Sequence, residues 1–146
     1  MRVRIIAIGK AKDRSLRVGL DEYYARIGRY AKFEEVEIKD GDAVEVAEKL
    51  SRNIPDRSRV VALEVDGRSF GSHEFAKWLG RAENDAVQTV VFLIGGAYGL
   101  PQDISKTADL RLSLSAMTFP HRLARLVLAE QIYRGFSILR GEPYDH

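Results

Sequence analysis

The spacing of apolar residues in the first part of the chain predicts a strand, a helix and a second strand. Residues 3–8 are apolar apart from Arg4, and the run is short and rich enough in β-branched side chains to be a buried strand. Apolar residues then recur at helical spacing from Leu16 to Ile27, with Ser15 as the expected N-cap. From Phe33 to Ile38 apolar and acidic residues alternate, which is typical of a partly exposed strand.

The same alternation of helix and strand continues to the end of the chain. A helix closes before Pro55, and a strand over 59–65 is expected to end in a turn at Asp66-Gly67. Ser72 is the expected cap of the next helix. The remaining expected elements are a very apolar strand over 88–94, a short helix over 101–107, a strand over 110–114, and a long helix over 121–139.

This order of elements predicts an α/β fold: a mostly parallel sheet with helices on both faces, in one domain over residues 1–146. Ligands of such sheets bind at the carboxyl ends of the strands, where the loops diverge. The rule directs attention to four segments, namely Gly9, Val65–Gly67, Gly95–Gly99 and Ser115–Pro120.

The composition excludes several classes of protein. The chain has no cysteine, so disulfides, thiolate metal sites and a cysteine nucleophile are all ruled out. Three isolated histidines leave little for a metal centre, and we expect none. No apolar run approaches the ~18 residues that a membrane helix needs, and the first residues alternate like a strand rather than a signal peptide. A cytoplasmic protein is expected.

Charge is unevenly distributed although the net charge is only +2. Residues 1–32 hold nine basic side chains against three acidic ones, a net charge of +6, whereas residues 33–50 have a net charge of −5. A basic face that meets phosphate is one interpretation, and an ordinary solvated helix surface is the other.

Two loops at the predicted ligand edge carry unusual residues. Gly95-Gly96-x-x-Gly99 follows a strand and is either a tight turn or a ligand cradle, but its spacing does not fit a dinucleotide fingerprint. The segment 113–120 is small, apolar and hydroxylic, so we expect it to be buried. It could surround a planar heterocycle with apolar side chains and backbone hydrogen bonds, or it could be plain core packing.

The last helix is apolar around most of its circumference, which is typical of a helix that is central to a domain or seals an oligomer interface. An arginine in such a helix, Arg125, needs a carboxylate, carbonyl or phosphate partner. His121 either caps the helix or contributes to a site. The tail ending in Tyr144, Asp145 and His146 is either frayed or folded over a site.

These residues together resemble one family. The specific parts are the Gly95–Gly99 motif, the run from Leu112 to His121, Arg125, Glu130–Arg134, and Pro143-Tyr144. Over its whole length the chain resembles the small SPOUT-class RNA methyltransferases of the RlmH type, which methylate N3 of a pseudouridine in large-subunit (23S) ribosomal RNA. The resemblance implies a C-terminal trefoil knot, S-adenosylmethionine as cofactor, and a homodimer that acts on ribosomal RNA or the ribosome without a metal.

Carried over residue by residue, the resemblance implies a cofactor site built by Leu63, Gly95, Gly96, Leu114, Ser115, Ala116, Met117, Thr118, Phe119 and Pro120. The chain departs from the family pattern in the tail, where Asp145 stands between Tyr144 and His146, which puts a role for His146 in doubt.

The weakly acidic N3–H of the acceptor requires groups that take its proton and hold the resulting anion. The available groups are Arg125 or Arg134, Tyr144, His121 and His146. With no separate RNA-binding domain, the fold itself must meet the RNA, and we expect phosphate contacts from Lys10, Lys12, Arg14, Arg17 and Arg134.

Three rival functions remain. A SPOUT enzyme acting on transfer RNA would share the cofactor loop, and a non-catalytic ribosome-binding module would keep the fold without the activity. A Rossmann-type oxidoreductase is disfavoured because the first strand ends in a lone Gly9 rather than a glycine-rich fingerprint.

Overall fold

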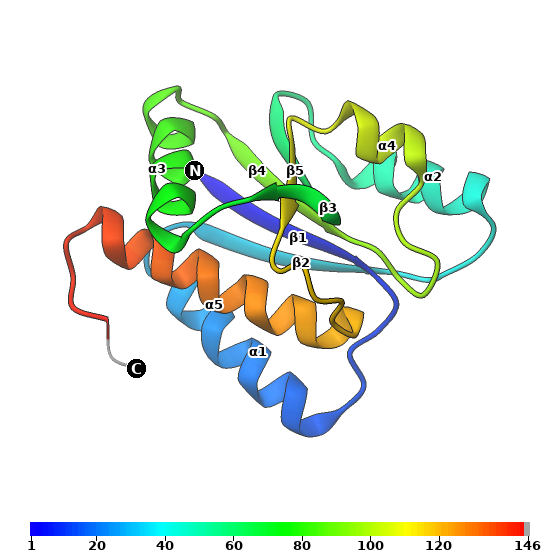
Figure 1. Cartoon of the computed structure of the whole chain (residues 1–146), viewed down its shortest axis with the longest axis horizontal. Coiled ribbons are helices and arrows are strands. Elements are labelled where there is room, and N and C mark those ends of the chain that lie inside the picture. Colours follow the sequence, from blue (N-terminus) through cyan, green and yellow to red (C-terminus); the bar gives the residue numbers. More distant parts are fainter. Residues whose placement is uncertain (145–146) are drawn as a thin grey trace.

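The computed structural model describes residues 1–144 and shows a five-stranded sheet whose paired strands all run parallel (Figure 1). The strands are β1 (Arg2–Ile8), β2 (Lys32–Ile38), β3 (Ser58–Ser69), β4 (Thr89–Ile94) and β5 (Leu110–Ser113), in the order β2-β1-β4-β3-β5. The helices are α1 (Arg14–Ile27), α2 (Ala43–Asn53), α3 (Ser72–Asn84), α4 (Gln102–Thr107) and α5 (His121–Leu139). The predicted α/β class is therefore confirmed. The knot stays a prediction.

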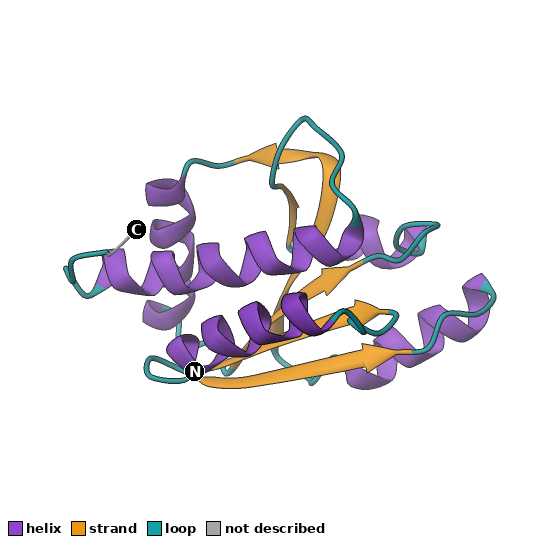
Figure 2. Cartoon of the chain, turned by 90° about the horizontal axis from the view of Figure 1, so that it is seen from below, coloured by secondary structure: helices purple, strands orange, loops and turns teal. Residues whose placement is uncertain are grey.

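The two faces of the sheet bury separate apolar cores. Alternate residues of the central strands, such as Ile5 and Phe92, pack in one core with α1, α3 and α5. Their neighbours, such as Ile6 and Leu93, pack in the other core with α2 and α4. Because both faces are covered, β1 and β4 are nearly continuous apolar runs. Figure 2 shows α1 and α5 side by side along the strands.

Strand β3 differs from its prediction. It does not turn at Asp66-Gly67 but continues to Ser69, with a shift of register against β5 between Leu63 and Arg68. The backbone of β5 lies so close that a Cβ on Gly67 would stand 2.7 Å from the carbonyl carbon of Arg111. The glycine therefore permits close strand approach at an irregularity rather than a turn.

Two predicted helix caps are also wrong by one or two residues. Asp13, not Ser15, caps α1, since its carboxylate accepts a hydrogen bond of 2.9 Å from the backbone N–H of Leu16. Gly71, not Ser72, is the N-cap of α3. At the start of α1, the carboxylate of Asp13 binds the free backbone N–H groups better than the hydroxyl of Ser15 would, because the helix dipole favours negative charge at this end.

Within residues 1–144, none of the helices combines the length and hydropathy needed to cross a bilayer.

Candidate active site

A cavity of about 240 Å³ opens at the carboxyl ends of β4 and β5, beside the part of β3 where its register against β5 shifts. Eight of the ten predicted cofactor residues line it: Leu63, Gly95, Gly96, Leu114, Ser115, Met117, Thr118 and Phe119. Ala116 and Pro120 are not among the lining residues. His121, from the first turn of α5, also lines the cavity.

Several lining residues were not among the predicted site residues: Glu64, Val65, Ile94, Gly99, Leu112 and Ala124. Val65 and Gly99 lie in segments that the carboxyl-edge rule singles out, so that rule could have found them. The signal for Ala124 was weaker, because it depends on which face of α5 turns toward the sheet.

The glycine segment is a tight turn that also forms a wall of the cavity. The N–H of Gly99 donates a 3.0 Å hydrogen bond to the carbonyl of Gly96, and Gly99 has a φ of 77°. A Cβ on Gly95 would stand 2.7 Å from the carbonyl carbon of Gly99. These glycines are needed to close the turn, and the closed turn presents its backbone to the cavity.

The loop between β5 and α5 is more exposed than predicted. The side chain of Met117 is 76% exposed, and Ala116, Thr118 and Pro120 are exposed as well, so the expectation of burial is wrong for this part of the loop. The loop satisfies its own backbone, because Ser115 Oγ accepts a 2.9 Å hydrogen bond from the N–H of Met117. None of the described elements packs over this loop, and its outer side is free to meet a ligand or another chain.

The cavity suits a neutral, flat ligand bounded by apolar groups. Its walls are mostly aliphatic and aromatic side chains and glycine backbone, together with the polar side chains of Glu64, Ser115, Thr118 and His121. The carboxylate of Glu64 is already engaged by Ser105 at 2.8 Å and Arg111 at 3.2 Å. The volume of 240 Å³ lies just below the ~300 Å³ at which pockets for drug-sized molecules begin.

Arg125 does not line this cavity. Its side chain is only 1% exposed and is held by two carboxylates, with Nη1 2.6 Å from Glu37 Oε2 and 3.1 Å from Glu35 Oε2. Its Nη2 donates to the carbonyl oxygen of Gly9 at 3.2 Å. The partner that the sequence required is thus a pair of acidic residues on β2, about ninety residues earlier in the chain.

A second polar cluster forms on α5 and the tail. Arg134 donates to Glu130 from Nε at 3.1 Å and from Nη2 at 2.9 Å, and Tyr144 donates a short hydrogen bond to the same carboxylate oxygen. The guanidinium of Arg134 lies 3.9 Å from the ring centroid of Tyr144. Burial and the hydrogen bond to Glu130 raise the pKa of Tyr144 to about 12, so at neutral pH the phenol keeps its proton.

This cluster stands apart from the cavity in the single chain. Glu130 comes nine residues after His121 on α5, a rise of roughly 13 Å along the helix axis. Figures 1 and 2 both place the tail at the opposite end of α5 from the β5–α5 loop. His146 and Asp145 lie outside the described residues.

Of the five predicted RNA-contact residues, four lie in α1 or just before it, and the fifth, Arg134, is paired with Glu130 on α5. Lys10, Lys12 and Arg14 are exposed. Arg17 is instead paired with carboxylates, at 2.8 Å from Glu35 and 3.2 Å from Glu37, and is only 29% exposed. Its charge is therefore largely balanced within the fold.

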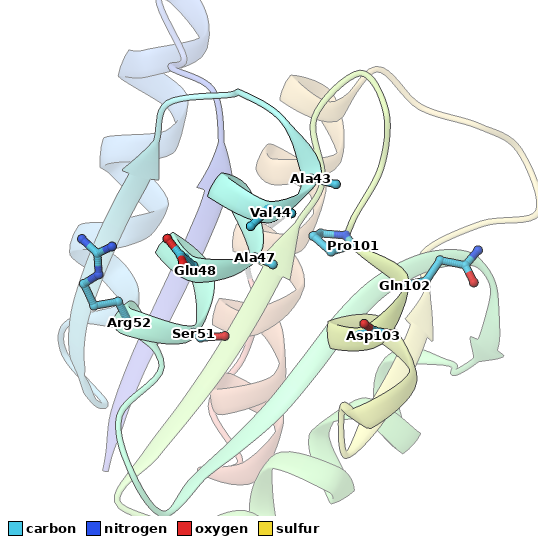
Figure 3. A pocket seen from close by; sticks show the side chains of 9 residues that line it. All are labelled: Ala43, Val44, Ala47, Glu48, Ser51, Arg52, Pro101, Gln102 and Asp103. Carbon is cyan, nitrogen blue, oxygen red and sulfur yellow. The ribbon is translucent and has the colours of Figure 1, made fainter.

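A larger groove of about 870 Å³ lies elsewhere, between α2 and the start of α4. Figure 3 shows that its walls come from these two helices, with the side chains of Arg52 and Gln102 pointing away from each other. It contains none of the predicted site residues and lies on the side of the α2–α4 core. The smaller cavity is therefore the candidate active site. Among residues 1–144 there is no cluster of three or more acidic or histidine ligands for a metal.

The fold agrees with comparisons to known proteins. A solved structure described as a probable methylase family protein from Haemophilus influenzae Rd KW20 superposes with a TM-score of 0.54 at 14% identity, covering 99% of this chain and 70% of the other. The family described as "Predicted SPOUT methyltransferase" matches residues 1–146. The chain belongs to the SPOUT methyltransferase family.

Three relatives that span the whole chain share one name. A protein of Sorangium cellulosum (strain So ce56) named ribosomal RNA large subunit methyltransferase H is 51% identical, with all of both chains covered. Proteins of the same name from Alkaliphilus oremlandii and Geotalea daltonii are 41% and 40% identical, over 99% and 100% of each chain. The resemblance to RlmH-type enzymes is thus confirmed.

Proposed function

We propose that this protein transfers a methyl group from S-adenosylmethionine to N3 of a pseudouridine in large-subunit ribosomal RNA. The observation that carries the proposal is the carboxyl-edge cavity, where eight residues named from sequence converge. Full-length relatives named as large-subunit ribosomal RNA methyltransferases support the choice of RNA. The reaction would take place in the cytoplasm, where ribosomes are.

The strand β3 and the two loops that line the cavity would hold the cofactor. Backbone groups of the Gly95–Gly99 turn would border one side of the adenine, and Leu114 and Phe119 would supply apolar contact with the ring. When bound, the cofactor supplies an electrophilic methyl group on a positively charged sulfur. An apolar wall near that sulfur favours transfer, because the positive charge disappears in the transition state.

The Glu130–Arg134–Tyr144 cluster would act on the acceptor base. Glu130 would take the N3 proton, and Tyr144 and Arg134, which both donate to its carboxylate, would hold it in position. The remaining N–H groups of Arg134 would donate hydrogen bonds to the negative charge that spreads onto the ring carbonyls. The nucleophilic N3 then bonds to the methyl carbon as the carbon–sulfur bond breaks, and the sulfur keeps the electron pair of that bond. His121, at the cavity rim, would contact the bound reactants.

The separation of this cluster from the cavity implies a homodimer. Because cluster and cavity lie at different places along α5, the cluster of one protomer would meet the cavity of its partner. Exposed apolar side chains near the cavity fit such an arrangement, including Met117 at 76% and Leu123 at 43% exposure.

The RNA would contact the exposed basic residues Lys10, Lys12 and Arg14. We omit Arg17, because its pairs with Glu35 and Glu37 balance its charge. We also omit Arg125 from the catalytic groups, because it is buried in the same ion-pair cluster.

The test is to incubate the protein with ribosomes and with bulk transfer RNA, both lacking the modification, together with labelled S-adenosylmethionine, and to map the methylated nucleotide by mass. The proposal expects one methylated pseudouridine in the large-subunit RNA. Label in transfer RNA alone would identify the rival enzyme. Cofactor binding without any transfer, or no binding at all, would favour a ribosome-binding module.

A further inference from the structure

The partly buried cluster around the fully buried Arg125 joins four separate parts of the fold. It contains Arg125 from α5, Glu35 and Glu37 from β2, and Arg17 and Tyr24 from α1. The fourth part is the segment after β1, whose backbone is hydrogen bonded to the cluster.

Charges in the cluster balance, with two arginines against two carboxylates. Burial raises the pKa of Glu37, but the hydrogen bonds from Arg125 and from the Ala11 N–H more than offset this effect, so the pKa lies below its usual value. The Tyr24 phenol donates a 2.6 Å hydrogen bond to Glu35, and burial together with this bond raises the pKa of Tyr24. The Glu37 carboxylate therefore stays ionised near neutral pH.

The cluster holds the segment after β1 at two successive points. The carbonyl of Gly9 accepts from Arg125 at 3.2 Å, and the N–H of Ala11 donates to Glu37 at 2.8 Å. The N–H of Gly9 also donates to the carbonyl of Ile38 at 2.7 Å. Lys10 stands between these points with an exposed side chain. Gly9 has a φ of 99°, which glycine adopts readily and other residues rarely do, so the chain can turn here between the two contacts.

Arg125 does not line the cavity, but its helix does. Ala124, directly before Arg125, lines the cavity, and so does His121, one helical turn before Arg125. A single side chain therefore connects the cavity wall to the segment 9–12, which carries Lys10 and Lys12.

We propose that Arg125 is a positioning residue that fixes the basic segment 9–12 relative to the cofactor cavity, so that RNA phosphates and the reacting centre are held in one geometry. The inference rests on the proposed function for its effect on RNA. Its structural part, the anchoring of the segment, stands independently of the substrate.

The test variant is Arg125→Lys. Lysine keeps the positive charge, so neither carboxylate is left without a cation, but a single ammonium cannot bridge both carboxylates and the Gly9 carbonyl. The matched control is Arg4→Lys. Arg4 also bridges a carboxylate, Glu34 at 2.9 Å, and a backbone carbonyl, Asn53 at 2.7 Å, but at the amino end of the sheet.

Hydrogen exchange tests the anchoring directly. Arg125→Lys should speed exchange of the amides of residues 9–11 at least tenfold relative to the amides of β1. Arg4→Lys should not. Exchange that is unchanged in this segment overturns the proposal, whether or not the wild-type protein methylates RNA.

Kinetics test the consequence for RNA. Arg125→Lys should raise KM for the RNA about tenfold while kcat and the cofactor Kd stay within about twofold. In a Lys10→Ala/Lys12→Ala background the same substitution should add less than about twofold, because Arg125 acts through these lysines. A full tenfold effect in that background would show a general structural defect and overturn the proposal. Wild-type protein inactive on ribosomal RNA would refute the proposed function, and the exchange result would still decide the anchoring.

Discussion

The substitution Gly95→Ala tests whether the glycine turn shapes the cavity. The added Cβ would stand 2.7 Å from the carbonyl carbon of Gly99, 2.8 Å from its Cα, and 2.9 Å from the nitrogen of Leu100. All three atoms are backbone, so no side chain can rotate away. Ordinary contact begins near 3.4 Å, and the turn would therefore have to open by about 0.7 Å.

The expected cost follows from this overlap. Overpacking of a tight site costs roughly 1–3 kcal/mol, which for a chain of this size lowers Tm by roughly 3–12 °C. Because the opened turn is also a wall of the cavity, the affinity for S-adenosylmethionine should fall at least tenfold. Thermal unfolding and isothermal titration calorimetry measure the two effects.

Gly80→Ala provides a control for the crowding. Its Cβ would stand 2.9 Å from Cδ2 of Leu139, the far end of a flexible side chain, so the neighbour can move and the cofactor affinity should not change. If Gly95→Ala melts and binds cofactor like the wild type, the turn does not form the cavity wall and the account of this site is wrong.

Four further predictions concern charge and hydrogen bonding. Glu37→Gln should flatten the acid side of the profile of unfolding free energy against pH. The folded-state pKa of Glu37 lies below its ordinary 4.5, so its contribution to stability is complete above pH 4.5 and is lost as the pH falls. Urea unfolding across the acid range should therefore show the stabilities of the variant and the wild type converging at low pH. Lys10→Glu/Lys12→Glu should weaken RNA binding and reduce the slope of log affinity against log salt by ~1.4, whereas an unchanged slope would remove these lysines from the interface. Tyr144→Phe should leave the cofactor Kd unchanged and lower kcat at least tenfold in single-turnover assays; equal kcat would exclude the phenol from the reaction. Arg59→Met, which breaks a surface pair with Asp85, should cost less than ~1 kcal/mol in chemical denaturation, and a larger loss would contradict its exposed setting.

Much of the fold could be predicted because local patterns determine it. The apolar runs of β1 and β4 are buried on both faces, so their position in a parallel sheet follows from the sequence alone. The end of β3 could not be predicted in this way. Asp66-Gly67 has the composition of a turn, but pairing with β5 carries the strand past it.

The candidate site was partly predictable for a similar reason. The carboxyl-edge rule and the family resemblance together found most of the cavity lining, since both depend on loops that follow strands directly. The role of Arg125 depends on Glu35 and Glu37, which only the pairing of β2 with β1 and the packing of α1 and α5 bring near it. A requirement for a partner could be read from the sequence, but not which partner satisfies it.

The most direct measurement of the central claim is a crystal structure of the protein with S-adenosylmethionine. The account predicts the adenosine between the Gly95–Gly99 turn and the loop from Leu114 to Phe119, with Leu63 at its edge. Cofactor bound in the groove between α2 and α4, or no binding at concentrations that saturate related methyltransferases, would contradict it.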